Sequence, residues 1–96
     1  MISTVPFDLS RVKKENLEME LLRVAIIAEL DAVNLYEQLS ALTNNAKIKA
    51  VFKDVAKEEK THVGEFQSLL LLLDKEQVKE LEHGIKEVKE LAEKTE

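Results

Sequence analysis

The hydrophobic positions of this chain recur at intervals of three and four residues, which is the spacing of one face of an α-helix, and they fall into three segments. Thr43-Asn44-Asn45 separates the first two segments and favours a turn, because these side chains bond to the local backbone. Asp74, followed three residues later by Gln77, resembles the start of a third helix, and Ser10 can cap the first. The pattern predicts an extended lead-in over residues 1–9 and helices over 11–43, 46–73 and 75–92, within one domain that spans 1–96.

The predicted helices differ in how much apolar surface they carry. The third has a single apolar stripe between Lys and Glu residues, which is typical of a helix lying on a surface. The first carries apolar side chains on more than one face between Leu21 and Leu42, more than a single antiparallel partner can cover. A chain of 96 residues also buries a smaller fraction of its surface than a longer one. We therefore expect an all-α fold, an antiparallel two-helix hairpin plus a C-terminal helix, with a four-helix bundle completed by dimerisation.

Composition narrows the classes of partner. The net charge is -5 and no basic cluster is present, which argues against nucleic acid, because neutralising phosphates needs concentrated Lys and Arg. The absence of cysteine removes disulfides and thiolate zinc sites. The longest apolar run, Leu69 to Leu73, is far shorter than the ~20 residues that span a bilayer, and the N-terminus lacks the pattern of a signal peptide. We expect a cytoplasmic protein with no membrane or nucleic-acid partner, for which a cation is the better match.

Three polar residues interrupt the apolar stripes of the first two helices. Following steps of three and four residues, Glu29 shares a face with Tyr36, and Glu59 shares a face with His62. Glu29 lies 15 residues before the turn at 44–45 and Glu59 lies 14 after it. At ~1.5 Å per residue, both are roughly 22 Å from the turn in an antiparallel hairpin. The sequence predicts that the three meet in one patch.

A dication explains this patch better than burial alone. A carboxylate in an apolar stripe is costly unless it is paired or binds a metal, and no Lys or Arg shares these stripes. Glu59 and His62 at i and i+3 can reach one ion, and Glu29 can bridge two ions across a dimer axis. Ferritin-like carboxylate proteins combine one Glu from each of two helices with a Glu-x-x-His from each of two others, and this chain holds one of each. Two chains supply four carboxylates and two imidazoles, a sulfur-free set that suits two iron ions per dimer, or manganese.

The stretches 22–38 and 54–66, which contain these ligands, resemble the encapsulated ferritin family, a two-helix branch of the ferritin-like superfamily. The resemblance covers roughly residues 17–92 and is closest to the archaeal type found joined to an encapsulin shell protein. It implies half of a ferritin-like bundle in each chain, a ferroxidase centre formed between two subunits, and a ring-like homodecamer of five dimers. It also implies iron oxidation here, with the mineral stored inside a surrounding encapsulin nanocompartment.

Carried over residue by residue, the resemblance implies that Glu29, Glu59 and His62 are iron ligands and that Tyr36 is the tyrosine beside them. Asp31 keeps the acidic pattern of a site through which iron enters. Positions 28 and 35 depart from other branches, because they hold Ala and Leu in place of Glu and Trp. No shell-docking peptide follows the third helix, as expected of a freestanding protein, a shortened one or the front portion of a shell fusion.

The predicted function is a ferroxidase that oxidises Fe(II) to Fe(III). One alternative is a rubrerythrin-like peroxidase that uses the same diiron centre to reduce peroxide. The alternative from another class is a metal-free helical assembly or cargo module, in which the buried Glu and His residues only fix the register of an interface.

Overall fold

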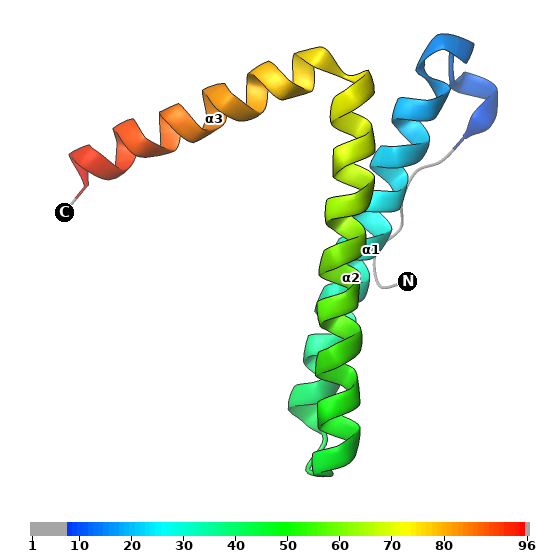
Figure 1. Cartoon of the computed structure of the whole chain (residues 1–96), viewed down its shortest axis with the longest axis vertical. Helices are drawn as coiled ribbons and strands as arrows, with labels where there is room; N and C mark the ends of the chain where they lie inside the picture. The colour runs from blue at the N-terminus through cyan, green and yellow to red at the C-terminus, as the bar shows by residue number, and fades with distance from the viewer. Residues whose placement is uncertain (1–7, 96) are drawn as a thin grey trace.

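The computed structural model describes residues 8–95, which form three α-helices preceded by two short 3-10 turns (Figure 1). The turns are η1, Leu9–Arg11, and η2, Lys14–Asn16; the helices are α1, Leu17–Leu42, α2, Ala46–Leu73, and α3, Lys75–Lys94. No strand occurs in the described part of the chain, so the predicted all-α fold is confirmed. Most of the predicted lead-in, residues 1–7, lies outside the described residues.

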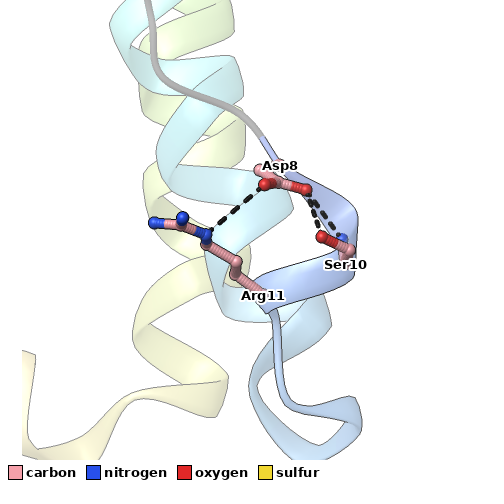
Figure 2. A network of polar contacts seen from close by, with 3 residues as sticks. All are labelled: Asp8, Ser10 and Arg11. Carbon is pink, nitrogen blue, oxygen red and sulfur yellow. Dashed lines mark hydrogen bonds and ion pairs between the residues drawn. The ribbon is translucent and has the colours of Figure 1, made fainter.

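The start of the first helix was predicted wrongly. α1 begins at Leu17, not at position 11, and Ser10 does not cap it. Instead, the Asp8 carboxylate accepts hydrogen bonds from the Ser10 N–H at 3.0 Å and the Ser10 hydroxyl at 2.6 Å, and lies 3.6 Å from the Arg11 guanidinium (Figure 2). These bonds hold η1 as a separate turn, and the extended backbone of Lys13 interrupts the chain before η2. The Ser10 donors also lower the pKa of Asp8 below its ordinary value.

α1 and α2 form an antiparallel hairpin (Figure 1). The Asn45 side chain caps α2 by accepting from the N–H groups of Lys47 and Ile48, at 3.0 and 3.1 Å. The Thr43 hydroxyl oxygen accepts from the Asn45 N–H at 3.1 Å, so the side chains of the turn satisfy its backbone donors. This turn fixes the register of the two helices.

The core of one chain is small. Among the described residues, the buried apolar side chains are Val33, Ala56 and Leu70. Ser40 is also buried, and its hydroxyl donates to the Lys49 carbonyl at 3.3 Å. Large apolar side chains elsewhere on the hairpin stay open to solvent, with Leu72 68% exposed. Most of the apolar surface therefore remains available for other contacts.

Asp74 alone separates α2 from α3, and α3 projects away from the hairpin (Figure 1). The Asp74 carboxylate caps α3 by accepting from the Gln77 N–H at 3.0 Å, and it accepts from the Arg23 guanidinium of α1 at 2.7 Å. The Asp74 N–H donates to the Leu70 carbonyl at 2.8 Å, so it is not free for the reciprocal bond of a capping box. The Gln77 N–H, followed by Arg23, lowers the pKa of Asp74 below its ordinary value.

The shape is extended for a chain of this length. The radius of gyration is 17.1 Å, whereas a compact chain of this length has about 12.5 Å. None of the helices in the described residues is long and apolar enough to cross a membrane. The extended shape and exposed apolar surface are consistent with association between copies, and dimerisation remains a prediction.

Candidate metal centre

Glu29 from α1 and Glu59 and His62 from α2 lie together on the hairpin. Each offers one ligand atom, and these atoms all lie within 4.8 Å of one another. The Nδ1 atom of His62 is 3.5 Å from Oε2 of Glu29 and 3.6 Å from Oε2 of Glu59. The structure thus brings together the three residues that the sequence placed on one patch.

Helix geometry and the turn account for this meeting. Glu59 and His62 are one turn apart on the same face of α2, and the capped turn at Asn45 sets Glu29 at their height. Lys60 and Glu37 form an ion pair at 3.0 Å between the same two helices, which supports this register. Both side chains of that pair are exposed, so it contributes no more than about 1 kcal/mol.

Glu29 carries an unsatisfied polar atom at the centre of the cluster. Its Oε2 atom is buried and accepts no hydrogen bond, because the 3.5 Å contact with His62 lacks hydrogen-bond geometry. The Glu29 and Glu59 side chains are only 20% and 18% exposed, whereas His62 is 44% exposed. A buried acceptor without a donor costs about 1–3 kcal/mol. A bound cation would satisfy this oxygen, and two carboxylates with one imidazole form a donor set that fits iron or manganese.

The face that carries the cluster continues into an apolar groove. Leu22 precedes Glu29 by seven residues and Leu69 follows His62 by seven, so each lies two turns away on the same face of its helix. Both line a groove together with Glu18, Leu21, Leu72 and Leu73. The cluster therefore sits at the edge of an open apolar surface of the hairpin.

Tyr36 packs two turns beyond Glu29 on α1. Its ring lies 6.2 Å from the Phe52 ring, measured between centroids, with the planes inclined by 33°. No hydrogen bond of its hydroxyl occurs within the described part of the chain. The structure shows a packing role for the ring, and the predicted role of the hydroxyl beside the ligands remains a prediction.

Asp31 is half-buried on α1 and does not belong to the cluster. It follows Glu29 by two residues, so it points about 200° away around the helix axis. Its predicted role in admitting iron remains a prediction.

His83 on α3 forms a second contact with carboxylates, which sequence reasoning missed. Its Nδ1 is 3.3 Å from Glu80 and its Nε2 is 3.1 Å from Glu87. The spacing of i−3 and i+4 on one helix could have revealed this pair of contacts. All three side chains are about 60% exposed, as expected of solvated surface groups.

Comparison with known proteins gives concordant likenesses. The sequence model of the rubrerythrin family matches residues 20–96. The chain is 55% identical over 94 residues to a ferritin-like-encapsulin shell fusion protein of Pyrococcus furiosus, a match covering 95% of the chain and 27% of that protein. It is 40% identical over 80 residues to the encapsulin nanocompartment cargo protein EncC of Myxococcus xanthus, covering 80% of the chain and 61% of EncC. The chain thus spans about a quarter of the first relative and three fifths of the second.

A solved structure is similar throughout. The crystal structure of the encapsulated ferritin domain from Pyrococcus furiosus is 52% identical to the chain and superposes with a TM-score of 0.81, with 95% of each chain covered.

Proposed function

The chain belongs to the rubrerythrin family, in its encapsulated ferritin-like branch, and from that membership we propose that paired copies oxidise ferrous to ferric iron at Glu29, Glu59 and His62. The unsatisfied Oε2 of Glu29 carries this proposal, because it faces an imidazole and a second carboxylate within ligand distance of one ion. The family membership adds that diiron chemistry is the ordinary use of such a fold.

A second copy completes the centre. Three donors from one chain leave most positions around an ion open. Two copies related by a two-fold axis supply four carboxylates and two imidazoles, with Glu29 of each chain bridging both ions. The open apolar surface beside the cluster is the surface that a second hairpin would cover. Activity then depends on association.

Iron is the substrate of this reaction and supplies its redox chemistry. Two Fe(II) ions each give up one electron, and dioxygen takes these two electrons and two protons to become hydrogen peroxide. With peroxide as the oxidant, the same electrons and protons produce two water molecules. Glu29 and Glu59 stabilise the added positive charge of Fe(III), and His62 must be unprotonated to bind.

The names of the relatives support an encapsulin shell as partner. One is a fusion of a ferritin-like part to an encapsulin shell, and another is an encapsulin cargo protein. We place this chain in the same setting, inside an encapsulin compartment of the cytoplasm, where the ferric product is deposited as mineral. Assembly beyond the dimer, with a decamer expected, belongs to the same proposal.

Peroxide reduction is the second candidate, because the matching family model is that of rubrerythrin. Turnover by iron-loaded protein with dioxygen and with peroxide separates the two functions. Faster turnover with peroxide, without net accumulation of ferric iron, would favour the peroxidase.

The ligands are tested by three single substitutions, Glu29→Ala, Glu59→Ala and His62→Ala. Each is expected to abolish rapid Fe(II) oxidation while leaving the helix content of the protein unchanged. Glu58→Ala is the matched control, because Glu58 is an exposed carboxylate next to Glu59. Bound iron should reach about one ion per chain. Wild-type oxidation rates in all three variants would disprove the proposal, and a stable oligomer that never binds iron would favour the metal-free assembly.

A further inference from the structure

α3 carries a regular apolar seam that its own chain leaves open. The α3 seam consists of Val78, Leu81, Ile85, Val88 and Ala92, spaced alternately by three and four residues. This is the spacing of the a and d positions of a coiled coil. Ile85 and Val88 are 64% and 66% exposed, and a shallow groove runs along the seam between Glu80 and Lys89. The surface that fits such a seam is another helix.

Gly84 lies beside the seam in the middle of α3 and has no role within its own chain. Glycine weakens a helix relative to alanine, and its usual compensation is a positive φ or a close approach of another group. Gly84 has a negative φ, and a Cβ atom added to it would meet nothing within 4 Å. A close approach by something outside the chain would account for this glycine.

A second copy of α3 in antiparallel orientation fits both features. Facing a and d positions then pair Val78 with Val88 of the second copy and Leu81 with Ile85 of the second copy, so four apolar layers form. In the same register, Gly84 lies opposite Gly84 of the second copy, where the two helices can approach closely.

The charges beside the seam favour the same arrangement. Like flanking positions face each other in an antiparallel pair, which sets Glu82 opposite Lys89 of the second copy, and this contact occurs twice by symmetry. In a parallel pair, Lys89 would instead lie beside Gly84 and Glu82 beside Gln77, with no ion pair formed. We propose that α3 pairs in antiparallel fashion with α3 of a second copy through its seam, with the two Gly84 residues facing each other.

This contact is separate from the face that carries Glu29, Glu59 and His62, and it needs no metal. A chain with both surfaces can bind one copy through its hairpin and another through α3. The proposal therefore goes beyond iron oxidation, because it concerns how dimers join.

A charge exchange in the full-length chain tests the pairing. Glu82→Lys opposes two lysines at both symmetric contacts and should weaken association through α3 about tenfold. Adding Lys89→Glu should restore the ion pairs and the affinity. Glu90→Lys is the matched control, because Glu90 lies on the opposite side of α3 and should not alter association. Sedimentation of metal-free protein over a range of concentrations measures each constant, and circular dichroism checks that α3 stays helical.

Gly84→Gln supplies an independent readout. Glutamine is a better helix former than glycine, so a solvent-facing position would gain helix stability without any effect on association. At a close crossing of two helices, the same change should weaken association at least tenfold while helicity is kept or increased.

The proposal is overturned if the double exchange fails to restore association, or if neither Glu82→Lys nor Gly84→Gln alters it. Loss of association in Leu81→Asp without any effect of the charge changes would assign the seam to another surface, such as a hairpin or a shell protein, and would also overturn it. Loss of iron oxidation with unchanged sedimentation would concern the metal centre alone, so failures of the two proposals are distinguishable.

Discussion

Glu29→Gln should stabilise the metal-free protein while abolishing iron oxidation. The ligand atoms of Glu29 and Glu59 lie within 4.8 Å of each other and neither side chain is more than one fifth exposed. Two negative charges at that separation repel by about 0.9 kcal/mol at the dielectric constant of water and by about 3.5 kcal/mol at an effective value of 20. Glutamine keeps the shape of the side chain, removes this repulsion and can donate a hydrogen bond to Glu59.

The expected gain, about 1–2 kcal/mol between these limits, corresponds to a rise of about 4–8 °C in melting temperature per kcal/mol for a domain of this size. Thermal unfolding is measured on metal-free protein at one fixed concentration and at pH 8, where imidazole side chains carry no proton. Adding Fe(II) without oxygen should then raise the melting temperature of the wild type but not of the variant. Glu58→Gln, on an exposed neighbour, should change stability by less than about 0.5 kcal/mol.

A fall in the melting temperature of metal-free Glu29→Gln would refute this account of the cluster. It would mean that Glu29 contributes to the fold through contacts of its own, as the metal-free alternative requires. Opposite effects on stability and on iron binding are the expected signature of a site maintained for its ligand.

Two further predictions concern side chains around the centre and at the joint. Tyr36→Phe keeps the ring beside Phe52, so the melting temperature should change little, whereas loss of the hydroxyl should slow iron oxidation about tenfold in stopped-flow measurements; an unchanged rate would leave Tyr36 a packing residue only. The lowered pKa of Asp74 means that its ionised form stabilises the folded state above about pH 4, and that this contribution is lost as the pH falls through the lowered value. Asp74→Asn keeps an acceptor for the Gln77 N–H but removes the ion pair with Arg23, so the stability deficit of the variant should be largest near neutral pH and should shrink below about pH 3, with a constant deficit contradicting this role.

The hairpin and its cluster followed from local rules, whereas the two ends of the chain did not. Counting residues from the turn was enough to place Glu29 beside Glu59, because straight antiparallel helices preserve height. The start of α1 was missed because Asp8 bonds both donors of Ser10, a competition between neighbouring polar side chains that hydrophobic spacing does not report.

The direction of α3 could not be read from the sequence either. It involves the contact between Arg23 and Asp74, which are 51 residues apart in the chain. The capping residue itself was predictable, because Asp74 stands directly before a helical pattern. Its second bond, to a side chain on another helix, is a tertiary contact without a local signal.

The single residue between α2 and α3 has a geometric consequence. Because Asp74 ends one helix and begins the next, the joint contains no slack in which a change of length could be absorbed. Each residue added there would turn α3 by about 100° around its own axis and carry its apolar side to a new bearing. The joint therefore fixes the rotational phase of α3 relative to the hairpin, and we expect insertions at this point to be far more disruptive than insertions in the turn at residues 43–45.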